Sequence, residues 1–264
     1  MTQAERRKYL ISALLREQPQ YSEIEIPSNE QEQKYLLRAL FNIRMPKSMP
    51  KEFLEIQDVY LHEEIENKGI TDIADLQPIQ DNLYLWQGDI TTLRCEAIVN
   101  AANSKMLGCF CPNHGCIDNA IHTFAGVQLR LSCAELMKEQ GNEAKTGKAK
   151  ITPGYNLPCK YVLHTVGPII TGRLKEKDKE LLASCYRSCL ELADLHGIKS
   201  IAFCCISTGE FHFPNDTAAQ IAVKTAKEYI RQNHSEIKVI FNVFKDIDYE
   251  IYRKLLGTNQ KTEK

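Results

Sequence analysis

The sequence predicts an α/β fold of three layers, with helices on both faces of a mixed, mostly parallel sheet, preceded by an N-terminal helical extension. From residue 82 onward, short apolar runs alternate with segments of helical periodicity, which is typical of a parallel sheet covered by helices. Before residue 80 the chain is mostly helical in pattern, and all ten cysteines and the single tryptophan follow residue 85. We therefore expect an extension at 1–80, an α/β domain at 81–258 and a C-terminal tail at 259–264.

Three amphipathic helices are expected in the extension. The first begins at a capping box formed by Thr2 and Glu5, and the second begins at a similar signal at Ser28. The third ends at Gly69. Helices of this size have apolar faces that must be buried, so we expect them to pack against the domain that follows. Nothing in residues 1–80 carries recognisable chemistry.

The elements of the α/β domain follow from the same patterns. The expected strands are Leu83–Trp86, Ala97–Asn100, Lys148–Thr152, Tyr161–Thr165, Ser200–Ile206 and Lys238–Val243. The expected helices are Ile117–Gln140, Asp178–His196, Asn215–Asn233 and Asp246–Leu256. Gly141 and Gly197 stand where C-terminal caps belong, and Asn215 where an N-cap belongs. Ligands of parallel sheets bind beyond the carboxyl ends of the strands, so loops 100–118 and 206–214 are expected to carry function.

Composition excludes several classes of protein. Hydrophobic residues make up 43% of the 264 residues and charged residues 25%, which is typical of a globular protein and not of a disordered one. The 33 basic and 34 acidic residues give a net charge of −1, so no overall basic field favours nucleic acid or membranes. Residues 1–19 read as an amphipathic helix and not as a signal peptide. We expect a cytoplasmic protein with reduced thiols and with neither a membrane nor a nucleic-acid partner.

Three thiols and an imidazole lie within eight residues of the first of these loops. Cys109, His114 and Cys116 are soft ligands that a compact loop can bring to one ion, and this ligand set is preferred by zinc. If Cys111 were a fourth ligand, the site would be closed and structural. If only three residues bind, the fourth position is open to water or substrate. Both arrangements predict one zinc ion per chain.

Three other segments have the chemistry of a nucleotide site. Asn100 and Asn103 follow a strand and offer amide donors and acceptors beside small alanines. The Ser-Thr-Gly-Glu-Phe loop at 207–211 can present backbone N–H groups to a diphosphate. Asp89 can accept a hydrogen bond from an adenine amino group, with Ile90 against the ring. Taken alone, each segment is also compatible with an ordinary turn.

In combination these segments resemble a known family, the macrodomains. The motifs, which occur in the family's order, are Gly88-Asp89-Ile90, Asn100-Ala-Ala-Asn103, Ile121-His122, Gly147-Lys-Ala-Lys-Ile-Thr-Pro-Gly154-Tyr, His164-Thr-Val-Gly-Pro168 and Ile206-Ser-Thr-Gly209. The resemblance covers about residues 70–256. It implies a macrodomain fold and ADP-ribose as the ligand, and many macrodomains hydrolyse ADP-ribose from proteins.

One loop departs from the common pattern of the family. The common hydrolase loop is Gly-rich and leads into Val-Asp-Gly, whereas this loop is longer and carries Cys109, His114 and Cys116. In this respect, and in the Glu-Phe after Ser-Thr-Gly, the chain is similar to the zinc-dependent bacterial macrodomains. In that subgroup the Cys, His and Cys ligate zinc, Cys111 is not a ligand position, and an N-terminal extension is present. The resemblance also implies a functional link to a sirtuin-type ADP-ribosyltransferase and to a lipoyl carrier protein.

The resemblance implies a zinc-dependent hydrolase that removes ADP-ribose from modified protein side chains, with an acyl linkage to Asp or Glu. It implies Asn103 and Asp118 as catalytic residues. The implied ADP-ribose-binding residues are Asp89, Ile90, Asn103, Ile117, Asp118, Ser207, Thr208, Gly209, Glu210 and Phe211. The alternative is a module that binds ADP-ribose without hydrolysis, in which zinc only braces the loop. An RNA-binding protein with a zinc knuckle is disfavoured by the neutral charge and by the lack of a basic-aromatic stripe.

Overall fold

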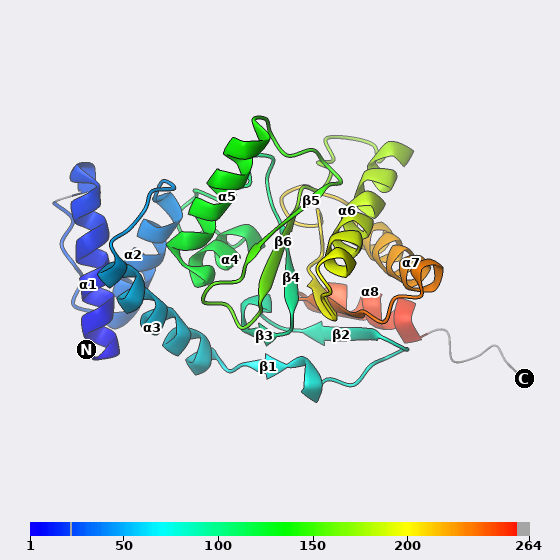
Figure 1. Cartoon of the computed structure of the whole chain (residues 1–264), viewed down its shortest axis with the longest axis horizontal. Helices are drawn as coiled ribbons and strands as arrows, with labels where there is room; N and C mark the ends of the chain where they lie inside the picture. The colour runs from blue at the N-terminus through cyan, green and yellow to red at the C-terminus, as the bar shows by residue number, and fades with distance from the viewer. Residues whose placement is uncertain (22, 258–264) are drawn as a thin grey trace, which may run out of the picture.

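A mixed sheet forms the centre of the molecule (Figure 1). The computed structural model describes residues 1–21 and 23–257, so the expected tail at 259–264 lies outside the described residues. Within them the sheet has six strands: β2 (Leu83–Gln87), β4 (Ala97–Ala101), β5 (Ala149–Pro153), β6 (Tyr161–Thr165), β7 (Ser200–Phe203) and β8 (Lys238–Val243). Their order is β2-β8-β7-β4-β6-β5, and β5 alone runs antiparallel to its neighbour. The predicted mixed, mostly parallel sheet is confirmed.

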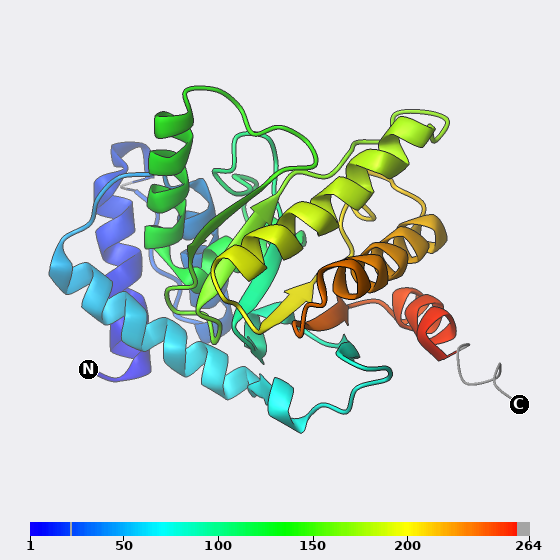
Figure 2. The same cartoon turned by 45° about the vertical axis from the view of Figure 1, so that its right-hand side comes forward.

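Helices cover both faces of this sheet (Figures 1 and 2). One side carries α4 (Ile117–Ala125) and α5 (Val127–Gln140), and the other carries α6 (Glu176–Leu195) and α7 (Asn215–Asn233). Helix α8 (Asp246–Gly257) packs beside β2, β8 and α7. The short elements are β1 (Thr71–Asp72), β3 (Leu93–Arg94), η1 (Pro19–Tyr21), η2 (Ile73–Asp75) and η3 (Ile90–Thr92).

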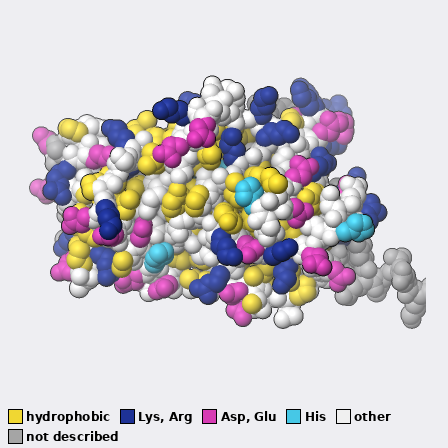
Figure 3. All heavy atoms as spheres, viewed as in Figure 1, with side chains coloured by type: hydrophobic (Ala, Val, Ile, Leu, Met, Phe, Trp, Pro, Cys, Tyr) yellow, Lys and Arg dark blue, Asp and Glu magenta, His cyan; other side chains and the backbone are white. Residues whose placement is uncertain are grey.

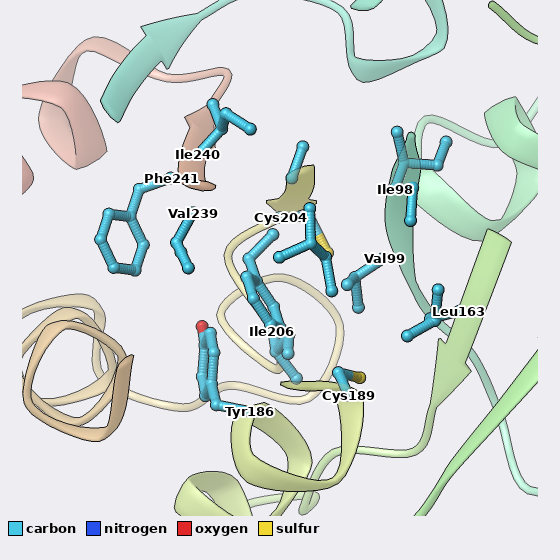
Figure 4. Packing of buried hydrophobic residues seen from close by; sticks show 14 of the residues in the cluster. Ile98, Val99, Leu163, Tyr186, Cys189, Cys204, Ile206, Val239, Ile240 and Phe241 are labelled. Carbon is cyan, nitrogen blue, oxygen red and sulfur yellow. The ribbon is translucent and has the colours of Figure 1, made fainter. Parts of the chain in front are cut away.

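The core lies between the central strands and helix α6 (Figure 4). Val99 of β4 and Leu163 of β6 face Cys189 and Tyr186 of α6, and Phe241 of β8 extends the same layer. Strands β4, β7 and β8 are buried on both faces, because helices cover both sides of a parallel sheet. This burial explains why they read as continuous apolar runs in the sequence.

The N-terminal helices lie beyond α4 and α5, at the opposite end of the molecule from α7 and α8 (Figure 1). They are α1 (Gln3–Glu17), α2 (Glu30–Ile43) and α3 (Lys51–Lys68). Their apolar faces form one cluster that also takes in Val127 of α5. Polar contacts cross the same boundary. The Asn42 amide donates to the Thr123 hydroxyl at 2.9 Å, and the Gln57 side-chain oxygen accepts from the Val127 N–H at 3.0 Å.

Glycine accounts for the main difference from the predicted helices. The expected helix at 117–140 is two helices, because the chain turns at Gly126 with a φ of 92°. A side chain would be strained at that φ, and a Cβ there would also lie 2.6 Å from the Gln57 amide nitrogen. The apolar periodicity of the sequence continues across the break, so the glycine itself is the one local signal that the helix ends there.

Two predicted caps are shifted by one residue, and one strand is shorter than expected. Asn29 and not Ser28 caps α2, because its side chain accepts the N–H groups of the first turn. Pro214 and not Asn215 occupies the N-cap of α7, and the Asn215 amide donates instead to Asp248 at 2.6 Å. The strand expected to reach residue 206 ends at Phe203. The capping box at Thr2 is present as predicted.

Surface charge is mixed on the face shown in Figure 3, where basic and acidic side chains are interspersed. This agrees with a net charge of −1. None of the helices in the described part of the chain is both long enough and apolar enough to cross a membrane.

Candidate active site

A cavity of about 1010 Å³ opens at the carboxyl ends of β2, β4, β7 and β8. This is the edge of a parallel sheet at which ligands bind, and the volume is suited to a small-molecule ligand. Every site residue that the family resemblance implies lines it: Asp89, Ile90, Asn103, Cys109, His114, Cys116, Ile117, Asp118, Ser207, Thr208, Gly209, Glu210 and Phe211. Asn100, also considered from the sequence, does not line it. The structure therefore brings together segments that are more than a hundred positions apart in the sequence.

The triad of Cys109, His114 and Cys116, called the metal triad below, converges at one end of the cavity. Its ligand atoms all lie within 4.8 Å of one another, and the Cys109 Sγ is 3.7 Å from the His114 Nδ1. In a tetrahedral zinc site, a sulfur ligand and a nitrogen ligand stand about 3.6 Å apart. The three residues therefore fit a zinc ion. Cys111 is exposed and does not belong to this group.

Neighbouring groups lie close to the metal triad. The Cys116 Sγ accepts the Asn119 N–H at the start of α4 at 3.4 Å. Burial raises the pKa of the Cys116 thiol to about 12, so a thiolate there needs the charge of a bound cation. On the other side of the site, the Glu210 carboxylate lies 3.7 Å from the His114 Nε2. This separation is too long for a hydrogen bond, so the carboxylate lies near the ring without fixing its orientation.

Next to the metal triad, a buried carboxylate fixes two asparagines. The Asp118 Oδ1 accepts from the Asn100 amide at 2.8 Å, and its Oδ2 accepts from the Asn103 amide at 3.3 Å. The Asn103 amide also donates to the Gly108 carbonyl at 3.1 Å, and its oxygen accepts the Lys105 N–H at 3.0 Å. Burial raises the pKa of Asp118 to about 6. The Asn103 side chain is therefore locked in one orientation at the cavity wall.

At the other end of the cavity, Asp89 is held from two sides. Its Oδ1 accepts the N–H and the hydroxyl of Thr91 at 3.0 and 2.6 Å, and its Oδ2 contacts the Lys68 ammonium at 2.9 Å. Burial by itself would raise the pKa of Asp89. The hydrogen bonds from Thr91 and the charge of Lys68 outweigh this effect, so the pKa lies below its usual value. The carboxylate is ionised and fixed in position.

The loop at 207–211 has an unusual backbone. Ser207 adopts a φ of 66°, and its hydroxyl is buried without a hydrogen-bond partner among the described residues. Gly167 packs so closely on this hydroxyl that a Cβ there would collide with it. A buried polar atom beside a cavity is a group that a ligand oxygen can satisfy.

Sequence reasoning missed several residues of this cavity, among them two cations of the N-terminal helices and two residues that follow β8. Arg38 of α2 and Lys68 of α3 both line it, so residues 1–80, in which the sequence shows no recognisable chemistry, contribute two cations to the cavity wall. No local signal marks either residue, because each reaches the cavity only through packing. Phe244 and Lys245 also line it. Both follow β8 directly, so the rule that ligands bind at the carboxyl ends of strands could have found them.

Known proteins resemble this chain over nearly its whole length. A family model for the Macro domain matches residues 99–222. A protein-ADP-ribose hydrolase of Treponema medium is 59% identical over 97% of this chain and 100% of its own length. A protein-ADP-ribose hydrolase of Staphylococcus aureus (strain MSSA476) is 50% identical over 94% of each chain. The chain belongs to the macrodomain family.

Solved macrodomains share the fold. A Trypanosoma brucei macrodomain in complex with ADP-ribose superimposes with a TM-score of 0.65, at 31% identity over 83% of this chain and 95% of that one. The predicted macrodomain fold, with its N-terminal helices, is therefore confirmed.

Proposed function

We propose that this macrodomain is a zinc-dependent hydrolase that removes ADP-ribose from modified protein side chains. The observation that carries the proposal is the position of the metal triad beside Asn103 and Asp118, in a cavity suited to ADP-ribose. The enzyme class is confirmed, because relatives at 59% and 50% identity over most of the chain are named protein-ADP-ribose hydrolases. The zinc dependence is our own inference from the chemistry of the site.

We propose one orientation of ADP-ribose in the cavity. The adenine lies at the Asp89 end, where the ionised carboxylate accepts from the exocyclic amino group and Ile90 contacts the ring. Phe244, which is 76% exposed at the cavity mouth, offers a second face for stacking. The diphosphate lies against the loop at 207–211, where the Ser207 hydroxyl lacks a partner. The distal ribose then reaches Asn103.

The side chains around the distal ribose have different roles in the reaction. Zinc, when bound, supplies a Lewis acid that polarises an oxygen or lowers the pKa of a water toward 7. The Asn103 amide orients the ribose, and Asp118 holds that amide in place. Ile117, at the start of α4, covers the apolar wall and limits the access of water. Glu210 lies beside the His114 imidazole, 3.7 Å from its Nε2.

The linkage and the partners are the finer part of the proposal. An acyl linkage to Asp or Glu is supported by the sequence features of the zinc-dependent subgroup, namely the loop at 109–116 and the pair Glu210 and Phe211. The same resemblance supports a sirtuin-type ADP-ribosyltransferase and a lipoyl carrier protein as functional partners. The cytoplasmic location and the absence of nucleic-acid binding stay predictions.

Metal analysis combined with turnover tests this proposal. The protein is purified without chelator, its zinc content is measured, and the release of ADP-ribose is followed from acyl-, arginine- and serine-linked proteins. We expect one zinc per chain and release from the acyl-linked substrate, which a chelator abolishes and added zinc restores. Calorimetry with ADP-ribose and a thermal melt control for folding.

Two results would contradict the proposal. Protein that folds and binds ADP-ribose but contains no zinc would remove the metal from the reaction. Zinc-loaded protein that binds ADP-ribose but releases it from none of the three substrates would favour the binding module.

A further inference from the structure

Helix α2 of the extension lies directly against the loop at 109–116, called the metal loop below. The Arg38 Nη2 donates to the His114 carbonyl at 3.0 Å, and its Nη2 and Nε donate to the Asn119 side-chain oxygen at 2.9 and 3.2 Å. One turn later on the same helix, the Asn42 side-chain oxygen accepts the Asn113 N–H at 2.9 Å. One face of α2 therefore binds two consecutive residues of the metal loop, and one of them is a metal ligand.

Arg130 of α5 joins the end of α2 to the beginning of the metal loop. Its Nη1 donates to the carbonyls of Phe41 and Asn42 at 3.2 and 2.7 Å, which have no partners within the helix. Its Nη2 reaches the Cys109 carbonyl at 3.5 Å, and its guanidinium stacks over the Phe110 ring at 4.3 Å. The first metal ligand is thus tied to α2 through a single buried arginine.

Asn119 connects Arg38 to other residues of the metal loop through hydrogen bonds. Its amide donates to the Cys111 carbonyl at 2.9 Å, and its backbone N–H donates to the Cys116 Sγ at 3.4 Å. Asn42 and Asn119 are both almost completely buried. If the metal loop moved, the Asn42 side-chain oxygen would lose the Asn113 N–H and the Asn119 amide would lose the Cys111 carbonyl, which is costly for buried polar groups. Asn113 also has a φ of 54°, a conformation that persists only where its surroundings impose it.

We propose that Arg38 and Asn42 are positioning residues of the active site, which hold the metal loop in the conformation that brings the three ligand atoms together. The metal loop contains neither helix nor strand, so its own backbone does not fix the ligands. The extension supplies that order from outside the α/β domain. This inference rests on the proposed function for the identity of the metal, which is zinc.

Arg38→Met tests the proposal, because it removes the donors and keeps the apolar stem. Lys34→Met is the matched control, since Lys34 stands one turn earlier on α2 and its ammonium contacts Glu30 and Glu64, at 3.3 and 3.0 Å. The zinc affinity of the full-length protein is measured by competition with a colorimetric chelator. We expect Arg38→Met to lose zinc affinity by on the order of 10- to 100-fold, and Lys34→Met to match the wild type.

Amide hydrogen exchange on the metal-free proteins separates this proposal from the proposed function. We expect faster exchange at residues 109–116 in Arg38→Met than in Lys34→Met, with unchanged exchange in the sheet. If the wild type takes up no zinc, the zinc site fails, but this comparison still decides the role of Arg38. A purely structural role would instead lower the melting temperature and speed exchange throughout the domain.

A milder variant covers the case in which Arg38→Met does not fold. Arg38→Lys keeps the charge but cannot reach both the His114 carbonyl and Asn119 with a planar fork. We expect its zinc affinity and its exchange rates to lie between those of Arg38→Met and the wild type. Zinc affinity and exchange equal to the wild type in the folded Arg38 variants would overturn the proposal.

Discussion

Within residues 1–21 and 23–257, two triads of histidine and cysteine have ligand atoms close enough for one metal ion, but they differ in burial and in access. The ligand atoms of the metal triad lie within 4.8 Å of one another at the cavity, and its three residues are half-buried. The same limit holds for His122, Cys133 and His164, which are buried in the core and are called the buried triad below. The distances between ligand atoms therefore do not distinguish the two triads.

Burial and neighbouring groups set the triads apart. Burial lowers the pKa of His164 to about 4 and raises the pKa of Cys133 to about 12, so both residues stay neutral. The His164 ring nitrogens already face the Thr152 hydroxyl at 2.9 Å and the Asn100 amide at 3.1 Å.

Charge does not separate the two triads. The Asp118 carboxylate lies 3.5 Å from the His122 Nε2, and Arg130 acts on the buried triad but also reaches the Cys109 carbonyl. The metal triad, in contrast, opens to the cavity. Access and free ligand atoms, more than distance, therefore distinguish a metal site.

The largest expected effect is that of Cys116→Ala, which removes one ligand of the metal triad. We expect zinc to be lost and turnover to fall by about 100-fold or more, because under the proposed function the metal stabilises charge in the transition state. The affinity for ADP-ribose should change far less, since the Asp89 end and the loop at 207–211 lie on other segments. Turnover and calorimetry on one preparation, with a thermal melt, check this. Equal losses of turnover and of ADP-ribose binding would show that zinc only stabilises the conformation of the loop.

The pH dependence of stability is expected to report on the buried triad. Above pH 6.5 its histidines are neutral in both the folded and the unfolded state. As the pH falls below 6.5, the unfolded chain binds protons that the folded one excludes, so the free energy of unfolding decreases until the folded pKa of His164, about 4, is reached. For His164 the loss approaches ~3 kcal/mol. Urea unfolding from pH 7.5 to 4 measures it.

The control for this pH effect is His164→Gln, which keeps a polar side chain that does not titrate. Its free energy of unfolding should fall less steeply with decreasing pH than that of the wild type. An identical pH dependence in both proteins would show that His164 is not the source of the effect.

Asp89→Ala should weaken ADP-ribose binding by about 1–3 kcal/mol, the usual effect of losing a hydrogen bond to a charged group. Neither triad includes Asp89, so the zinc content should be unchanged. Isothermal calorimetry and metal analysis on the same sample measure both quantities. An unchanged dissociation constant would place the adenine elsewhere.

The smallest effect is expected from Cys133→Ala in the buried triad. Removing one buried sulfur should lower the free energy of unfolding by about 1 kcal/mol, by analogy with other small deletions in a core. Zinc content and turnover should match the wild type. If this variant lost its zinc, the buried triad would be the metal site and the comparison would be reversed.

Elements and motifs with local signals could be predicted from the sequence. The strands of the sheet were found because buried strands read as short apolar runs, and the metal triad was found because its ligands lie within eight residues. The predicted site loops meet at one cavity because the carboxyl ends of parallel strands share one edge. Each of these inferences needs only near neighbours in the chain, or one general rule of topology.

Tertiary structure alone decided the rest. Arg38 stands 76 positions before His114, and Lys68 stands 21 positions before Asp89, and nothing near either residue in the sequence points to its partner. The close approach of Gln57, which belongs to another helix, to the backbone at Gly126 exists only in the folded chain. The buried triad is likewise assembled from separate elements. Sequence determined the local elements and the metal loop, because periodicity and short spacing involve residues that are close together in the chain. Packing decided which distant side chains complete the site, because such contacts exist only once the elements are assembled.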